Sequence, residues 1–294
     1  MIHKIEPHKY YPEFRNQYPK ENDYVLIFEE NSIYLPKDKE GQLFLPSFKQ
    51  AHKLLKVKCP LDRFLLDTEY LFSIDDTAFF RLDAAKCTFL LPLEGQLYSP
   101  SVFRTFVPEY LAFAGITACQ INRFRLDRTY CGRCGHLTQP STTERACICP
   151  SCGMIEYPKI SPAIITAVID GDKILLTRYA GGSYKHWALV AGFVEVGETF
   201  KGAVRREVME EVGLKVSDIV YYKSQPWSFS DSTMVGFFAR LDGDAAITLQ
   251  ESELAQAEWF SRADIPELPS DISIGQEMIT YFKNGGNPFA DSSL

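Results

Sequence analysis

One stretch of this chain, residues 192–214, decides the fold and has the sequence GFVEVGETFKGAVRREVMEEVGL. It follows the spacing G-x5-E-x7-R-E-U-x-E-E-x-G-U, in which U is a bulky apolar residue. Seven fixed residue types at about one in fifteen each give a chance match on the order of 10⁻⁸ per starting position. The matching residues are Gly192, Glu198, Arg206, Glu207, Val208, Glu210, Glu211, Gly213 and Leu214.

The second half of this stretch, residues 199–212, is predicted to form a helix. Val208 and Val212 are an i, i+4 apolar pair, which is typical of a helix face that packs on a core. Gly213 follows them and suits a left-handed residue that ends a helix. Gly192, Gly197 and Gly202 permit a tight entry from a strand through a loop into the helix.

Three carboxylates share one face of this predicted helix. At about 100° per residue, Glu211 lies about 40° from Glu207, and Glu210 lies about 60° to the other side. Like charges this close destabilise a helix unless a cation lies among them, and their oxygen atoms suit Mg²⁺ or Mn²⁺. Arg206 keeps its proton, so it orients a carboxylate rather than acting as an acid or base. The alternative is a solvated acidic face, against which the glycine and arginine constraints weigh.

Composition indicates a globular protein of about two domains, since the chain has 294 residues, of which 46% are hydrophobic and 23% charged. No apolar run approaches the roughly 20 residues of a membrane helix. The first residues lack an apolar core for export, so we expect a cytoplasmic location and no membrane partner. The net charge of -7 disfavours broad nonspecific binding to nucleic acid, but it leaves a single nucleotide or an RNA end as a partner.

Four cysteines are predicted to hold one structural zinc ion per chain. They form two C-x2-C pairs with 14 residues between the pairs, and a glycine that permits positive φ follows each pair. Four thiolates suit a closed tetrahedral Zn²⁺ site. Disulfides are the alternative, which an intracellular chain disfavours, and Cys147 competes with Cys149 as a ligand. The predicted ligands are Cys131, Cys134, Cys149 and Cys152, while Cys59, Cys87 and Cys119 are predicted to be small core residues.

The chain is predicted to have three segments: an N-terminal α+β domain (1–127), a zinc ribbon (128–156) and a catalytic domain (157–294). Strands mixed with helices indicate an α/β (α+β) fold with a sheet covered on both faces. The expected N-terminal elements are strands near 24–28, 64–67 and 78–82 and a helix over 101–123. The expected C-terminal elements are strands at 163–169, 173–178, 186–193, 218–222, 234–241 and 257–260, with helices over 199–212 and 274–282.

A second motif, SQPWSFSDS at residues 224–232, begins ten residues past the first. Flat aromatic rings in a ligand need aromatic or amide partners, which Gln225, Trp227 and Phe229 supply. Taken alone, such a loop also serves core packing.

The first stretch resembles the Nudix box, the signature of metal-dependent hydrolases of nucleoside diphosphates linked to another moiety. The second resembles SQPWPFPxS, which marks the NADH pyrophosphatases (NudC type), with Ser228 and Ser230 in place of two prolines. That family places a four-cysteine zinc ribbon before the Nudix domain and a degenerate Nudix-like domain in front of both. The resemblance covers about residues 128–283 and implies a Nudix α/β/α sandwich with a mixed sheet, preceded by the ribbon.

The resemblance implies hydrolysis of the pyrophosphate bond of NADH or NAD⁺ to a nicotinamide mononucleotide and AMP, and removal of NAD caps from RNA 5′ ends. It also implies a homodimer with catalytic Mg²⁺ or Mn²⁺. The general base stays open between Glu253 and the glutamates of the box. The implied catalytic and metal-binding residues are Glu207, Glu210, Glu211 and Glu253, with Glu198 and Arg206 in support. The implied substrate-binding residues are Tyr157, Phe193, Gln225, Trp227, Phe229, Ser232 and Gly275.

Two alternatives to this function remain. The first is a Nudix hydrolase of another nucleoside diphosphate derivative, such as ADP-ribose or a dinucleoside polyphosphate. The second is an inactive zinc-ribbon binding protein. A local basic stretch comprises Arg123, Arg125, Arg128 and Arg133. It either contacts an RNA backbone or forms surface salt bridges.

Overall fold

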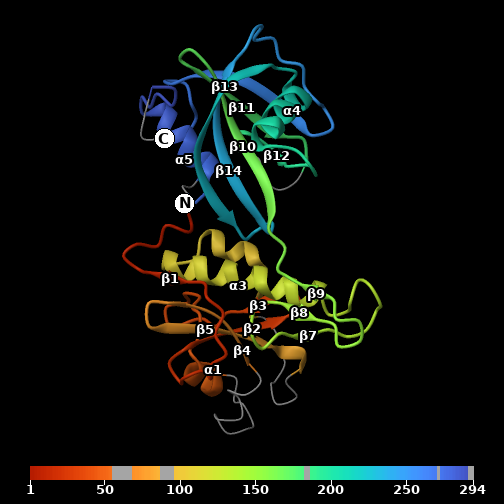
Figure 1. The fold of residues 1–294 in the computed structure, drawn as a ribbon. Helices are drawn as coiled ribbons and strands as arrows, with labels where there is room; N and C mark the ends of the chain where they lie inside the picture. Colours follow the sequence, from red (N-terminus) through yellow and green to blue (C-terminus); the bar gives the residue numbers. More distant parts are fainter. Residues whose placement is uncertain (55–67, 87–95, 182–185, 270–271, 291–294) are drawn as a thin grey trace. The chain divides into compact units, whose positions relative to one another are not determined.

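The structure is a computed structural model that describes residues 1–54, 68–86, 96–181, 186–269 and 272–290 (Figure 1). No described helix is both long and apolar enough to cross a membrane. The chain divides into two compact units, each built on its own sheet. The C-terminal unit comprises Met1–Ile2, Ile160–Trp227 and Asp231–Leu294, and the N-terminal unit comprises His3–Lys159 and Ser228–Ser230.

A mixed sheet forms the centre of the C-terminal unit. β10 and β14 run parallel, and the other neighbouring strands run antiparallel. The strand order is β13 (Val216–Trp227), β14 (Ser232–Leu241), β10 (Ser161–Asp170), β11 (Lys173–Tyr179) and β15 (Leu254–Ser261), and β12 (Val190–Phe193) also pairs with β10.

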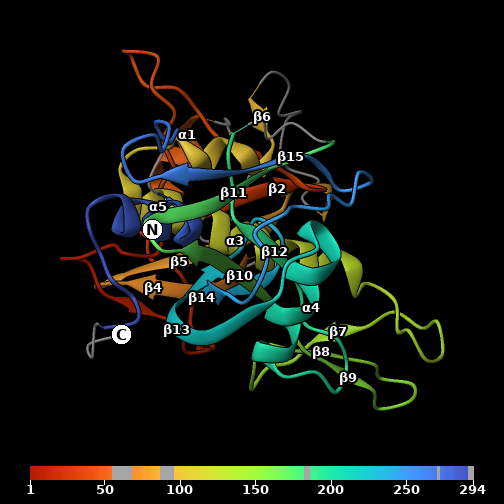
Figure 2. The ribbon, with the colours of Figure 1, turned by 90° about the horizontal axis from the view of Figure 1, so that it is seen from above.

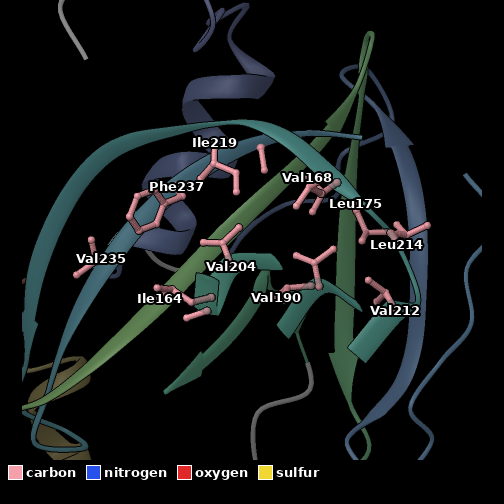
Figure 3. Packing of buried hydrophobic residues seen from close by; sticks show 14 of the residues in the cluster. Ile164, Val168, Leu175, Val190, Val204, Val212, Leu214, Ile219, Val235 and Phe237 are labelled. Atoms are coloured by element: carbon pink, nitrogen blue, oxygen red, sulfur yellow. The ribbon is translucent and has the colours of Figure 1, made fainter. Parts of the chain in front are cut away.

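Helices cover both faces of this sheet. α4 (Phe200–Val212) and α5 (Ile274–Lys283) lie on opposite sides of β10 and β14 in both views (Figure 1, Figure 2). Successive side chains of β10 alternate between the faces: Val168 packs in the core beneath α4, and Ile169 packs in the core beneath α5. Figure 3 shows the α4 side, where Val204 and Val212 of the helix lie against residues of the strands. The predicted α/β/α sandwich with a mixed sheet is therefore confirmed.

Local chemistry explains where α4 begins and ends. The Thr199 hydroxyl accepts a hydrogen bond from the Gly202 amide at 3.1 Å and caps the first turn. Gly213 ends the helix with φ 71°, a left-handed conformation that favours glycine. Apolar residues at helical spacing form the buried stripe, so the predicted helix is confirmed: Ala203, Val204, Val208 and Val212.

The segment before the box differs from its prediction. A single strand over 186–193 was expected, and only β12 pairs with β10. Ala188 instead pairs with Thr177 of β11. Because the segment passes from one neighbouring strand to the other, its pairing changes partner and the regular strand is shorter.

The N-terminal unit also contains a mixed sheet. It has α1 (Phe48–Leu54), α3 (Glu109–Asp127) and the 3-10 turns η1 (Ala84–Lys86) and η2 (Pro100–Arg104). Its strand order is β1 (Tyr10–Tyr11), β4 (Thr68–Ile74), β5 (Thr77–Asp83), β2 (Tyr24–Glu29), β3 (Ser32–Tyr34) and β6 (Leu97–Tyr98). The expected strands near 24–28 and 78–82 are present, and the run at 64–67 lies outside the described residues, as do Cys59 and Cys87.

The two sheets share one topology. The order β4-β5-β2-β3-β6 corresponds strand for strand to β13-β14-β10-β11-β15. The parallel pair is β2 with β5 in one sheet and β10 with β14 in the other, and the remaining pairs are antiparallel in both. A helix follows the last strand of each of these two sheets, α3 after β6 in one and α5 after β15 in the other.

The helix predicted at 101–123 begins later than expected. α3 begins at Glu109, and residues before it form the η2 turn. Pro108 occupies the N-cap position. Because proline has no amide hydrogen and is excluded from a helix interior, the helix cannot extend back through it. The apolar pattern extends over both elements, so periodicity alone did not separate them.

A small three-stranded sheet, β7 (Gln139–Pro140), β8 (Cys147–Ile148) and β9 (Ile155–Glu156), forms the ribbon within the N-terminal unit. Arg125 of α3 anchors it, because this buried guanidinium pairs with Glu69 and donates to the Ala146 carbonyl at 2.8 Å. Arg145 donates to the carbonyl oxygens of Pro12 and Leu71. Two arginines therefore fix the ribbon to the body of its unit.

Gly213→Ala tests the C-terminal cap of α4. An alanine here would have to adopt positive φ, and its Cβ would lie 2.9 Å from Thr248 Cβ. We expect the free energy of unfolding to fall by about 1–2 kcal/mol, measured by urea denaturation. Gly181→Ala is the matched control, since a Cβ there meets open space. Equal stability of the two variants would contradict this account.

Candidate functional site

Four thiols converge in the ribbon. The Sγ atoms of Cys131, Cys134, Cys149 and Cys152 all lie within 4.8 Å of one another, and two of their separations are 3.6 and 3.5 Å. Tetrahedral Zn²⁺ with Zn–S bonds of about 2.3 Å needs sulfur separations of about 3.8 Å. The donor set and its spacing therefore fit the predicted structural zinc.

The two C-x2-C pairs have the same backbone geometry. The amides of Gly135 and Gly153 donate to the carbonyls of Cys131 and Cys149 at 2.9 and 3.0 Å. Both glycines have positive φ, 73° and 71°, as the sequence predicted.

Cys147 takes no part in this cluster. It is buried, and its Sγ accepts a hydrogen bond from the Arg125 guanidinium at 3.0 Å. The choice of Cys149 over Cys147 as the fourth thiol is therefore supported by the geometry.

The turn before α4 brings the box residues together. On β12, Gly192 lies against the carboxyl group of Glu207, where a Cβ would come within 2.0 Å of Glu207 Cδ. Any larger residue would displace that carboxylate. This close approach explains the first glycine of the motif.

Arg206 binds three of the box carboxylates at once. Its guanidinium forms a bidentate pair with Glu198 at 2.9 Å for both bonds, and it contacts Glu207 at 2.7 Å and Glu210 at 3.0 Å. It also donates to the Phe193 carbonyl at 2.9 Å. Hydrogen bonds from Arg206 and from the Glu195 amide lower the pKa of Glu198. The arginine thus has the orienting geometry that the sequence predicted.

Glu211 is the most buried acidic group of the box. Its side chain belongs to a residue that is 2% exposed, and Oε2 has no hydrogen-bond partner among the described residues. Burial, together with the charges of Glu207 and Glu253, raises the pKa of Glu211 to about 8. Burial also raises the pKa of Glu207, and Arg206 opposes that shift.

These carboxylates fit a divalent cation in chemistry. Glu207, Glu210, Glu211 and Glu253 offer hard oxygen atoms. Burial and the charges of the other three raise the pKa of Glu211. Glu211 Oε2 is an orphaned acceptor that a cation would satisfy. Among the described residues, only the four cysteines already bring three or more ligand atoms within 4.8 Å. Two of the four carboxylates, Glu207 and Glu210, are paired with Arg206.

The aromatic residues predicted to bind substrate differ in exposure. Phe193 is 53% exposed and Tyr157 is 57% exposed, and the Tyr157 hydroxyl donates to Glu144. Trp227 is half-buried at the end of β13, and the half-buried Phe229 stacks under the Arg104 guanidinium at 4.3 Å.

The polar residues predicted to bind substrate are buried. Gln225 is fully buried, and its amide bonds to the backbone of Ile272 and Ile274. Ser232 is 2% exposed and pairs with Trp227 across the β13–β14 hairpin. Gly275 lies in the first turn of α5, where a Cβ would come within 2.7 Å of Ile165 Cδ1.

The basic stretch is largely engaged in internal contacts. Arg125 pairs with Glu69, Arg128 with Glu156 at 3.1 Å, and Arg123 donates to the Ser228 carbonyl. Arg128 thus forms a salt bridge near the surface, as the second alternative expected, whereas Arg125 is buried and its pair with Glu69 is internal.

Sequence reasoning missed the backbone groups of the site. The Ala191 amide donates to the Glu211 carboxylate, and the Glu195 amide donates to Glu198. Residue identity carries little signal for a backbone donor, so no pattern would have found them. Arg125 and Arg145, which anchor the ribbon, were also missed, because their partners lie far away in the sequence.

Comparison with known proteins finds two family matches in the segments that carry these residues. Residues 159–282 match the NUDIX domain, and residues 128–157 match the NADH pyrophosphatase zinc ribbon domain. A Haemophilus influenzae (strain PittGG) protein called NAD-capped RNA hydrolase NudC is 46% identical over 167 residues, covering 54% of this chain and 62% of that protein. Its Escherichia coli O1:K1 / APEC namesake is 43% identical over 163 residues, with the same coverage.

Among solved structures, a Nudix hydrolase from Nitrosomonas europaea is 24% identical with a TM-score of 0.47, covering 55% of this chain and 96% of its own. The chain spans about 62% of the length of the curated relatives it matches. It contains a Nudix domain directly after a zinc ribbon of the NADH pyrophosphatase type, as its two motifs predicted.

Replacing single cysteines tests the zinc site. Cys131→Ser removes one of four thiolates, so we expect the bound zinc to fall well below one ion per chain, measured by elemental mass spectrometry. Cys147→Ser is the matched control and should keep one zinc ion. Full zinc in Cys131→Ser would show that the ligand set is wrong.

The raised pKa of Glu211 predicts a pH-dependent stability. The folded state holds the proton up to about pH 8, whereas the unfolded chain releases it near 4.5, so stability falls as pH rises between these values. Without Mg²⁺ or Mn²⁺ at pH 8.5, the free energy of unfolding of Glu211→Gln, measured by urea denaturation, should exceed that of the wild type by about 2–4 kcal/mol. Near pH 5 the difference should almost vanish.

Gel filtration into buffer without divalent cations would prepare this protein, since it leaves tightly held zinc in place. Glu251→Gln, at an exposed glutamate outside the box, is the control and should show no such difference. A Glu211→Gln variant that is less stable than the wild type at pH 8.5 would contradict the claim that burial of the charged Glu211 carboxylate lowers stability.

Proposed function

We propose that this chain, with its Nudix domain behind a zinc ribbon, is a metal-dependent hydrolase of the pyrophosphate bond of NADH and NAD⁺. The products are a nicotinamide mononucleotide and AMP. Water adds across the P–O–P bridge, so one phosphate gains the hydroxyl and the other leaves with the bridging oxygen and a proton. The observation that carries the proposal is the carboxylate cluster around buried Glu211, inside a matched Nudix domain.

The residues of the box divide the work of this reaction. Glu207, Glu210, Glu211 and Glu253 would hold Mg²⁺ or Mn²⁺, which neutralises phosphate charge and lowers the pKa of a coordinated water. Arg206 keeps Glu198 and Glu207 in place by the hydrogen bonds described above. The Ala191 amide fixes the orientation of Glu211. The proton of the attacking water passes to Glu253 or to a glutamate of the box.

Aromatic rings are proposed to bind the bases of the substrate. Phe193 directly follows Gly192, the residue that packs on the Glu207 carboxyl group. Tyr157 and Trp227 supply further aromatic surface, which flat heterocycles favour. Gly275 is proposed to contact the substrate through its backbone.

Removal of NAD caps from RNA is the second candidate activity. It is favoured by the name of the relatives, NAD-capped RNA hydrolase NudC, at 43% to 46% identity. The reacting bond is the same, so the same carboxylates would serve. Arg125 and Arg128 are paired internally, so an RNA chain would need other contacts.

The proposed organisation keeps three segments, 1–127, 128–156 and 157–294. The shared strand order of the two sheets supports a Nudix-like N-terminal domain. A homodimer and a cytoplasmic location are further expectations, tested by light scattering in solution and by cell fractionation. The four convergent thiols fit a reducing compartment.

Product analysis with NADH and Mn²⁺ tests the activity directly. We expect nicotinamide mononucleotide and AMP, separated by chromatography, and no product without a divalent ion. Glu211→Gln should lower kcat by a factor of about 100 or more, since it removes a charged ligand. Glu251→Gln is the control. Near-normal turnover by Glu211→Gln would show that the assigned roles are wrong.

Turnover of several substrates separates the rival functions. NADH and 5′-NAD RNA should be cleaved with higher kcat/KM than ADP-ribose or a dinucleoside polyphosphate, by about tenfold or more, if aromatic contacts recognise the nicotinamide. A preference for ADP-ribose would instead favour the other Nudix activity. No metal-dependent turnover of any of these would favour the binding-protein alternative.

A further inference from the structure

We infer that Gln225 is a positioning residue that acts through the start of α5 and does not itself touch the substrate. The α5 lead-in is defined as residues 272–275. The inference rests on the proposed function, because the lead-in ends at Gly275, a proposed substrate contact. It assigns to Gln225 a role other than the substrate contact that the motif implied.

The amide of Gln225 is committed to the backbone. Its Nε2 donates to the Ile272 carbonyl at 2.8 Å, and its Oε1 accepts from the Ile274 amide at 2.6 Å. Donor and acceptor partners of this kind fix which end of the amide is which. The residue is 0% exposed, so a substrate in the site has no access to it.

These two bonds hold the backbone of the α5 lead-in at the residues before and after Ser273, the N-cap of α5. Ser273 and Gln276 form a capping box, in which the Ser273 hydroxyl accepts from the Gln276 amide at 3.3 Å. Gln225 therefore satisfies the Ile274 amide and Ser273 satisfies that of Gln276. The amide between them belongs to Gly275, so its position is set by two side chains.

The lead-in also packs against the strand that borders the carboxylates. A Cβ on Gly275 would lie 2.7 Å from Ile165 Cδ1 of β10. Ile165 pairs with Ala191 of β12, and the Ala191 amide donates to Glu211. The lead-in and Glu211 thus lie at the same level of the sheet, on the faces covered by α5 and α4 respectively.

Loss of Gln225 would leave the Ile274 amide without its partner and would reduce the Ile272 carbonyl to the single bond that it accepts from the Ile2 amide at 2.9 Å. Because a buried backbone group without a hydrogen-bond partner costs free energy, we expect the segment that carries it to shift. Gly275 would move with the lead-in, whereas the box carboxylates are held separately by Arg206 and Ala191. Substrate affinity should therefore suffer more than the chemical step.

A double-mutant cycle with Gln225→Met and Ser273→Ala tests the inference, using NADH and Mn²⁺. Methionine keeps the volume of glutamine without its hydrogen bonds. We expect Gln225→Met to raise KM about tenfold with kcat within about twofold, and to lower the unfolding midpoint. The double variant should have less than the summed effect on both readouts, because both residues act on one segment. Gln139→Met, at an exposed glutamine of the ribbon, is the matched control.

The outcomes discriminate between roles. Direct contact with substrate predicts a raised KM, an unchanged unfolding midpoint and additive effects, and that result would overturn the inference. An unchanged KM in Gln225→Met, with active wild type, would also overturn it and leave the proposed function intact. Wild-type protein that cleaves no NADH would overturn the proposed function and this inference together.

Discussion

Concentrated negative charge along α4 is the constraint on which the site depends. Glu211 is buried and forms no ion pair with any residue that the structure describes, and Arg206 is shared among Glu198, Glu207 and Glu210. Such a cluster is tolerated only if a proton or a cation neutralises part of it. The raised pKa of Glu211 shows the first solution, and a bound divalent ion would provide the second. The same residues that lower stability at high pH would thus be the ligands of the proposed metal ion.

The rest of the C-terminal unit serves to hold this cluster in place. Gly192 lets β12 approach Glu207, and the apolar stripe of α4 fastens the helix to the sheet. A buried valine contributes about 1.5–3 kcal/mol, so the stripe offsets the cost of the buried carboxylates. Removing the packing would release the charges, and therefore scaffold and site cannot be separated energetically.

Local patterns predicted the parts of the molecule whose causes are local. The helix over 199–212 follows from period-3.6 spacing, an N-cap threonine and a terminal glycine, all within one short stretch. The zinc ligands follow from two C-x2-C-G turns. α3 was misplaced at its start because its apolar pattern runs on through Pro108, and proline rather than periodicity sets that boundary. The site's backbone donors and the partners of Gln225 depend on contacts between distant segments, which no local pattern encodes.

The shared topology of the two sheets shows that the fold alone does not confer the chemistry. α1 occupies the chain position of α4 between the second and third corresponding strands, yet its residues, FKQAHKL, include no acidic side chain. Its Lys49 and Lys53 would repel a divalent cation. Within the same unit, Arg125 joins α3 to the ribbon. The proposed activity therefore depends on which of the two similar sheets carries the acidic helix, and only the C-terminal one does among the described residues.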